Sequence, residues 1–231
     1  AAAARLAARE GARVGVNYVA AADRANALVA DIEAAGGRAV AVQADVTVPA
    51  DVERLFATVH DALGPVDALV NNAAIQFPVR SFVDFTWEDF ERKLVNELKA
   101  AFHCCQAAIP HLRERDGGAI VNVSSGLSRY PGHGFVAHSS AKSALDAFSR
   151  GLAMELGPQQ IRVNVVGPGL TLTDATAGQP EEMKAAIARM TPLKRLGLPD
   201  DVSGAIVFLC SDLARFISGT YLPVSGGIQM L

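Results

Sequence analysis

Small and polar residues recur along this 231-residue chain, each group directly after a stretch of apolar and β-branched residues. Residues of these types can contact a nucleotide or a small substrate, but they also favour ordinary turns. One such group alone would indicate a turn. Their repetition after successive predicted strands indicates a ligand-binding crevice. The groups are Tyr18, Asp45, Asn71-Asn72, Ser124-Ser125 and Gly167-Pro168-Gly169.

The elements that must position these groups alternate between strand and helix patterns. Strands are predicted over Arg13–Tyr18, Arg38–Asp45, Ala68–Ala73, Ala119–Ser125, Ile161–Val166 and Tyr221–Val224. Helices are predicted for the first ten residues, Asp23–Ala35, Ala50–Leu63, a long segment from its Thr86 cap towards Arg115, Val136–Leu156 and Asp200–Leu213. We expect Pro110 to kink or end the long helix, and we expect Thr171–Met190 to form a loop with a short helix over the site.

Strict alternation of strands and helices predicts an α/β fold, with a parallel sheet covered by helices on both faces. The strands are nearly continuous apolar runs, as expected when both faces of a sheet are buried. No repeat or linker divides the chain, so one domain over residues 1–231 is predicted.

Composition narrows the function classes. Half of the residues are apolar, the net charge is −3, and there is no run of Lys or Arg, so neither nucleic acid nor a membrane surface is an expected partner. The apolar runs are too short to span a bilayer. Three cysteines without CxxC spacing argue against a disulfide framework or a zinc site, which favours a reducing, cytoplasmic compartment.

Several motifs in a fixed order make the chain resemble the short-chain dehydrogenase/reductase family, and within it the 3-oxoacyl-(acyl carrier protein) reductase or ketoreductase members. They are Ala44-Asp45, NNAA at 71–74, Asn96 in a long helix, VNVSS at 121–125, Lys142, NVVGPG at 164–169 and VSGG at 224–227. The match covers nearly the whole chain. The resemblance implies a Rossmann-like, doubly wound sheet that binds a nicotinamide dinucleotide.

The cofactor positions follow from this resemblance residue by residue. Asp45, with Val46 beside it, matches the aspartate that contacts the adenine ring, and Asn72 and Ala73 match the segment near the adenosine ribose. Ala74 replaces the glycine of the family's NNAG motif. The segment along the nicotinamide is matched by Pro168, Gly169, Thr171 and Thr173.

The catalytic positions match with one departure. Ser125 matches the serine that hydrogen-bonds the substrate oxygen, and Asn96 matches the asparagine that holds a water in the proton relay. Lys142 matches the lysine that binds the nicotinamide ribose and lowers the pKa of the neighbouring acid. The family's tyrosine stands thirteen residues after the serine and four before the lysine, and here that residue is His138.

The histidine changes the expected proton chemistry. A tyrosine has an ordinary pKa of about 10 and a histidine one of about 6.5, and a nearby ammonium favours the neutral imidazole. Neutral imidazole can accept a proton, as alcohol oxidation requires, but it is a poor proton donor near neutral pH. Three interpretations stay open: a working acid or base with altered pH behaviour, a fold whose activity is non-redox or lost, and an engineered substitution.

The family also opens with a strand and a glycine-rich TGxxxGxG loop whose amides bind the pyrophosphate. This sequence begins beyond that loop, in the body of the first helix. The opening strand belongs in the middle of the sheet, and a sheet without it has unpaired ladders. We therefore expect residues upstream of Ala1. A natural truncation that cannot bind a dinucleotide is the alternative.

Cofactor preference and assembly are predicted from fewer residues. Tyr18 stands where NAD-preferring members carry an acidic residue, and Arg24 is the nearest arginine, which favours NADP(H) over NAD(H). The pocket segments 75–80, 126–134 and 170–190 suit a neutral or modestly polar alcohol or carbonyl compound. The two long helices resemble the family's oligomer interface, so a homodimer or homotetramer is expected.

Two function classes compete at this stage. The first is an NAD(P)-dependent oxidoreductase of small alcohols or ketones. The second is a member of the same fold with lost or non-redox activity, such as a pseudoenzyme, an isomerase or a cyclase, because His138 replaces the tyrosine. No metal ligands are expected, since His60, His103, His111 and His133 are interpreted as surface or hydrogen-bonded side chains.

Overall fold

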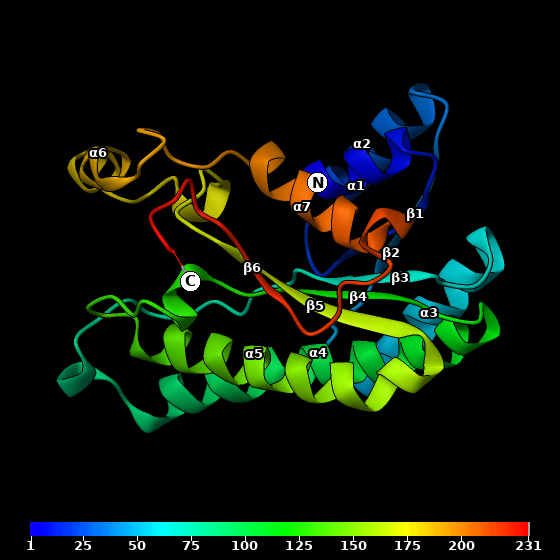
Figure 1. Ribbon diagram of the computed structural model, residues 1–231, viewed down its shortest axis with the longest axis horizontal. Coiled ribbons are helices and arrows are strands. Elements are labelled where there is room, and N and C mark those ends of the chain that lie inside the picture. Colours follow the sequence, from blue (N-terminus) through cyan, green and yellow to red (C-terminus); the bar gives the residue numbers. More distant parts are fainter. Residues whose placement is uncertain (231) are drawn as a thin grey trace.

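A computed structural model describes residues 1–230 and confirms the alternation of strands and helices (Figure 1). The strands are β1 (Arg13–Tyr18), β2 (Arg38–Gln43), β3 (Ala68–Asn71), β4 (Gly118–Val123), β5 (Ile161–Pro168) and β6 (Tyr221–Val224). The helices are α1 (Ala2–Arg9), α2 (Ala22–Ala34), α3 (Pro49–Leu63), α4 (Trp87–Glu114), α5 (Val136–Leu156), α6 (Glu181–Met190) and α7 (Pro199–Cys210).

Helices cover both faces of the strands, as predicted. In Figure 1, α1, α2 and α7 lie on one side, and α3, α4 and α5 lie on the other. Each side has its own apolar core: Ile120 and Val163 pack towards α3, α4 and α5, whereas Val121 and Val166 pack towards α7. Neighbouring residues of β4 and β5 thus point into opposite cores, which explains why these strands are apolar without interruption.

The strands form two parallel sheets within residues 1–230, where the sequence predicts one. β1 pairs with β2, and the other four strands follow the order β3-β4-β5-β6. One apolar core joins the sheets, because Val42 of β2 and Phe56 of α3 belong to the same cluster as Cys104 of α4 and Ile120 of β4. Side-chain packing through α3 and α4 therefore connects the two sheets without a backbone ladder between β1 and β3.

Three strands end before the polar residues that were predicted to close them. β2 ends at Gln43, and Asp45 lies beyond it, where Oδ1 of Asp45 accepts hydrogen bonds from the backbone N–H and the hydroxyl of Thr47. Such local side-chain bonds compete with the strand ladder. β3 likewise ends at Asn71 and β4 at Val123, whereas β5 continues past Val166 to Pro168. Asp45, Asn72, Ser124 and Ser125 therefore lie in loops beyond the strand ends, whereas Tyr18, Asn71 and Pro168 are the last residues of their strands.

The long helix α4 continues through Pro110 to Glu114. Of the prediction that this proline would kink or end the helix, the part that the helix ends there is wrong. Tertiary packing outweighs the lost backbone hydrogen bond, because Ala108 and Leu112 on either side of the proline are completely buried. At its other end, Thr86 caps the helix as predicted, with its hydroxyl accepting from the Asp89 N–H at 3.2 Å.

Cys104 and Cys105 are buried free thiols in the core, and Cys210 is a half-buried one. Among residues 1–230, no helix combines the length and the apolar character that crossing a bilayer would require.

Candidate functional site

The ends of β3, β4 and β5 lie at one edge of the larger sheet, because the strands are parallel and in register. Asn71 is opposite Asn122, and Nδ2 of Asn71 donates to Oδ1 of Asn122 at 2.8 Å. Asn122 in turn donates to the hydroxyl of Ser149 on α5 at 2.7 Å. This buried polar seam fixes the strand ends relative to α5, the helix that carries His138 and Lys142.

Lys142 is buried at this edge. Its ammonium group donates to the Val123 carbonyl at 2.7 Å and forms an ion pair with Oε1 of Glu97 at 2.5 Å. Because an ammonium group has three donors, one N–H of Lys142 remains beyond these two partners. The last residue of β4 and the middle of α4 together hold Lys142 in place.

Glu97 is the centre of a buried ionic cluster. Its second oxygen, Oε2, pairs with the ammonium group of Lys93 at 2.5 Å and accepts from the backbone N–H of Ile75 at 3.3 Å. Lys93 also donates to the Ile75 carbonyl at 2.8 Å. Both partners of each ion pair are at most 5% exposed. The cluster Lys93–Glu97–Lys142 thus ties α4 to α5 and to the loop after β3.

The ionisation of this cluster follows from its partners. Burial alone would raise the pKa of the Glu97 carboxyl, but the ammonium groups of Lys142 and Lys93 outweigh it and hold that pKa below its ordinary value. Burial lowers the pKa of Lys93, although Glu97 opposes the shift. With the carboxylate charged between two ammonium groups, the cluster carries a net charge of about +1.

His138 lies one helical turn before Lys142 and stacks on Phe77, with ring centroids 4.8 Å apart and planes 16° from parallel. Its Nδ1 atom is buried and has no hydrogen-bond partner within residues 1–230. Burial, followed by the charges of Lys93 and Lys142, lowers the pKa of His138 to about 4. Lys93 also stands 5.0 Å from the centre of the Phe77 ring. The imidazole is therefore neutral at pH 7, and the same burial and charges make it a weaker base than an ordinary histidine.

Ser125 lies directly after β4, at the start of a short 3-10 turn over Gly126–Ser128. Its hydroxyl accepts from the Leu127 N–H at 3.2 Å, and its carbonyl accepts from the Tyr221 hydroxyl at 3.0 Å. Within the described residues no hydrogen bond links Ser125 to His138. Ser125 is half-buried, and its hydroxyl donates to no acceptor within the described residues.

Asn96 does not join this group. It is half-buried, and its side chain makes no hydrogen bond with the described part of the chain. Successive helix residues are rotated by about 100°, so the next residue, Glu97, is the one that points at Lys142. The structure therefore places Glu97 beside Lys142, where the resemblance implied Asn96.

Sequence reasoning missed Lys93, Glu97 and Phe77. A signal for the first two was present: they share one helix face with Ala100, Cys104 and Ala108, all of which are buried. Two opposite charges at i and i+4 within an otherwise apolar stripe indicate a buried ion pair. Phe77 lies in an irregular loop, and periodicity gives no indication of its place.

The predicted cofactor residues range from exposed to buried. Asn72 and Ala73 are exposed after β3, whereas Val46 is buried. Pro168 and Gly169 close β5, the Thr171 hydroxyl bonds the Gly169 carbonyl, and Thr173 begins a short 3-10 turn. A Cβ at Gly169 would come within 3.1 Å of Ser225, so the backbone is closely packed there.

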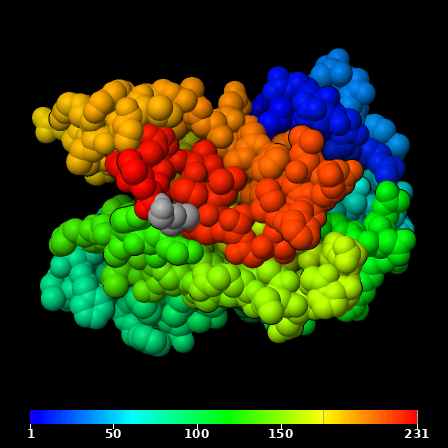
Figure 2. Space-filling view, viewed as in Figure 1, coloured from blue at the N-terminus to red at the C-terminus, as the bar shows by residue number. Residues whose placement is uncertain are grey.

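A cavity of about 410 Å³ continues the edge beyond β5 and β6. It is lined by Gly169, Leu170, Ile187 of α6, Asp201 of α7 and the segment Pro223–Gln229. In Figure 2, the red C-terminal segment lies between α6 and the green segment that precedes α5. A Cβ at Gly126 would overlap the Gln229 side chain, so this segment also covers the turn after Ser125.

These residues fit a nicotinamide nucleotide at the strand edge. At the β3 end of the edge, the exposed residues Asn72 and Ala73 offer backbone polar groups. At the β5 end, the segment Pro168–Thr173 offers backbone and hydroxyl groups. Lys142, which donates to the last residue of β4, lies between them, and His138 is one helical turn before it. Arg24 is exposed and pairs with Asp174 at 2.7 Å, close to the second of these segments.

Comparison with known proteins gives a consistent family assignment. A family model described as enoyl-(acyl carrier protein) reductase matches residues 1–229. L-rhamnose 1-dehydrogenase (NAD(P)(+)) of Azotobacter vinelandii is 41% identical over 98% of this chain and 91% of its own length. A 3-oxoacyl-[acyl-carrier-protein] reductase of Staphylococcus epidermidis is 32% identical over 96% of this chain and 91% of its own.

A solved structure shares the fold. The blue fluorescent protein from a metagenomic library, in complex with NADPH, superposes with a TM-score of 0.88 at 36% identity. The match covers 99% of this chain and 93% of that one. The Rossmann-like fold expected from the motifs is thereby confirmed.

The lowered pKa of His138 predicts a pH-dependent loss of stability. The imidazole of the unfolded chain binds a proton below about pH 6.5, whereas folded His138 does so only near pH 4. The contribution of neutral His138 to the free energy of unfolding is therefore complete above about pH 6.5 and is lost as the pH falls towards 4. Between pH 7 and pH 5 the loss is about 2 kcal/mol.

Urea denaturation of the native protein and of His138→Gln at the two pH values checks this. Both proteins carry the same carboxylates, so the difference between their pH responses isolates the imidazole. An equal pH response in the two proteins would contradict the lowered pKa.

Proposed function

We propose that this chain transfers a hydride between NAD(P)(H) and a small alcohol or ketone. The chain belongs to the short-chain dehydrogenase/reductase family and is an NAD(P)-dependent oxidoreductase. The observation that carries this proposal is the neutral imidazole of His138, buried one turn before Lys142 at the strand edge. It is a proton acceptor placed where the family positions its proton-transfer residue.

In this proposal Ser125 and His138 act on the substrate oxygen. The Ser125 hydroxyl hydrogen-bonds that oxygen, and His138 takes its proton when an alcohol is oxidised. The nicotinamide, when bound, supplies the hydride acceptor or donor. Lys142 uses its remaining N–H to hold the nucleotide's ribose, and its charge keeps His138 neutral.

Glu97 and Lys93 position and tune Lys142 and His138 from helix α4. Glu97 restrains the Lys142 ammonium, and Lys93 adds a second positive charge that disfavours the imidazolium. We therefore assign the helix α4 contribution to Glu97 in place of Asn96. At pH 7 His138 is in the neutral form that alcohol oxidation requires, because with a pKa of about 4 only roughly one His138 in a thousand is protonated.

NADP(H) is the proposed cofactor. Tyr18 ends β1 with no carboxylate to repel a 2′-phosphate. Arg24, at the start of α2, stands exposed and supplies a guanidinium that can bind one. The relative whose structure contains NADPH supports the same choice.

A second candidate function rests on the same histidine. Because His138 is a very weak proton donor at neutral pH and Lys142 is already engaged by Glu97, the fold could bind a nucleotide without reducing carbonyl compounds. A pseudoenzyme, an isomerase or a cyclase would keep the pocket and dispense with hydride transfer.

One experiment separates the two functions. We expect the full-length protein to bind NADPH, measured by nucleotide fluorescence, and to oxidise small alcohols at neutral pH. His138→Tyr should raise ketone reduction at pH 7 by at least about tenfold, because a tyrosine beside Lys142 is a better proton donor there. Ser125→Ala, which leaves the ionic cluster intact, is the matched control and should lower both directions.

The outcomes are distinct. If neither nucleotide binds, the redox proposal is wrong. If a nucleotide binds and only His138→Tyr turns over, the protein is a redox-impaired member and the second candidate holds.

Cofactor preference has its own test. Arg24→Ala should weaken NADPH binding by about tenfold, the loss of one charge-assisted contact, and leave NADH binding unchanged. Arg5→Ala removes a comparable surface ion pair, with Asp31, and serves as the control. Equal effects of Arg24→Ala on both nucleotides would contradict the proposed role.

We also propose a homodimer or homotetramer that associates through α4 and α5. These helices pack side by side, and Val95 and Phe102 of α4 expose 47% and 44% of their surface. Light scattering should give two or four times the mass of one full-length chain. Phe102→Asp should shift the mass towards one chain, whereas Phe216→Asp, a fully exposed phenylalanine after α7, should not. A native protein of single-chain mass would refute the interface.

A further inference from the structure

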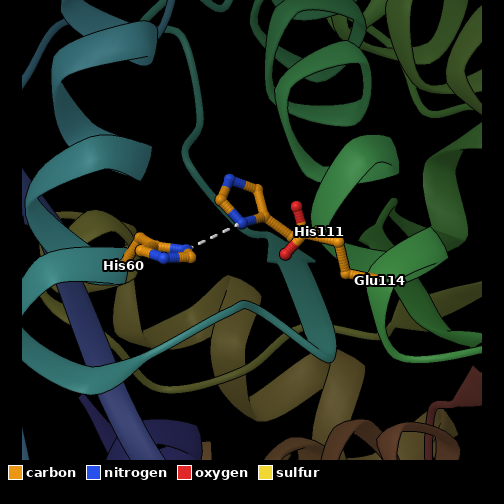
Figure 3. Close-up of side chains that lie close together, drawn as sticks. All are labelled: His60, His111 and Glu114. Carbon is orange, nitrogen blue, oxygen red and sulfur yellow. Dashed lines mark hydrogen bonds between the residues drawn. The ribbon is translucent and has the colours of Figure 1, made fainter.

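Three potential metal ligands from two helices meet at the edge of the molecule opposite to His138. His60 lies in the last turn of α3, and His111 and Glu114 lie in the last turn of α4 (Figure 3). One ligand atom from each of the three lies within 4.8 Å of the others. The sequence separates His60 from His111 by 51 residues, so only the fold brings them together.

The distance between the two imidazoles suits a shared metal ion. The Nδ1 atoms are 3.3 Å apart. Two nitrogens bound at 2.0–2.1 Å to a tetrahedral zinc ion would be about 3.3–3.4 Å apart. A hydrogen bond between two nitrogens is normally shorter, at about 2.9–3.0 Å. The separation therefore corresponds better to two lone pairs directed at one ion than to a good hydrogen bond.

The ligands are held in this arrangement by the fold. The His111 ring stacks on Phe56, a buried residue of α3, with centroids 5.8 Å apart and planes at 26°. His111 and Glu114 are three residues apart on one helix face, and this spacing survives because α4 continues through Pro110. Leu112, between them, is completely buried and anchors the turn.

The electrostatics of the two helix ends also favour a cation. α3 ends at Leu63 and α4 at Glu114, so the negative poles of both helices lie near the cluster. Arg38 donates to the Ala62 carbonyl at 3.1 Å and partly compensates the negative charge at the carboxyl end of α3. The Glu114 carboxylate is exposed and adds a full negative charge.

We propose that His60, His111 and Glu114 form a transition-metal site, selective for zinc over Mg²⁺ and Ca²⁺. Two imidazoles and one carboxylate are a zinc ligand set, and an exposed fourth position is left for water. The cluster precedes β3 and β4, so it lies at the amino ends of the strands, whereas His138 and Lys142 lie at their carboxyl ends. The bound metal is therefore structural and takes no part in the proposed redox chemistry.

Its location gives the metal a mechanical role. α3 packs on β1 and β2, and α4 packs on β3 and β4. A zinc ion shared by α3 and α4 would fasten these two neighbouring helices to each other. Zinc should thus stabilise the packing of α3 against α4.

Calorimetric titration of chelator-treated, full-length protein with ZnCl₂ tests the site. We expect one zinc ion per chain, and a melting temperature raised by about 5–10 °C when free zinc is about 100-fold above Kd. MgCl₂ at the same concentration should have no effect. Bound Co²⁺ should give the intense visible absorption of tetrahedral coordination.

Four variants distinguish this site from other binding. His60→Ala and His111→Ala should each abolish the zinc-dependent rise in melting temperature, and Glu114→Gln should weaken binding without abolishing it. His133→Ala, an exposed histidine in the loop before α5, should bind zinc like the native protein. Zinc-free melting temperatures show whether each variant is folded, and His60→Gln replaces any alanine variant that is not. Unchanged zinc affinity in both folded histidine variants, or no binding by the native protein, would overturn the proposal.

Discussion

The site depends on one buried carboxylate. Glu97 is inaccessible to water and keeps its charge because each of its oxygens meets an ammonium group. Removing one partner from a buried ion pair typically costs about 3–5 kcal/mol, since the other charge is left uncompensated. The positions of α4, α5 and the loop after β3 are therefore coupled through this single side chain. Burial keeps His138 neutral, and the charges of Lys93 and Lys142 add to this effect, so the surroundings of the imidazole set its protonation state.

The catalytic constellation was predictable from sequence only where chain spacing fixes it. His138 and Lys142 are one helical turn apart, and the serine lies just after a strand, so these positions follow from local geometry. Asn96 was matched through the family resemblance to the asparagine that holds a water, but the helix presents Glu97 to Lys142. Phe77 and the Gln229 side chain reach the site from irregular segments, and only the folded chain brings them there.

The fold shows the same division between local and non-local causes. Strand and helix positions follow from periodicity and agree within a few residues. Pro110 has an unfavourable local preference that the burial of its neighbours overrides, and such burial is not visible from the proline itself. The pairing of His60 with His111 joins the ends of two helices that the sequence pattern describes separately, so no local signal indicates it.

The placement of Lys93 and Glu97 on one face of α4 also constrains how such a site can evolve. A glutamate introduced at position 97 finds an ion-pair partner at once in Lys142. A lysine introduced first at position 93 would be buried with no carboxylate beside it, and a lone buried ammonium is strongly unfavourable. The viable mutational path is therefore ordered, with Glu97 preceding Lys93. Reversal must follow the opposite order, with Lys93 lost before Glu97.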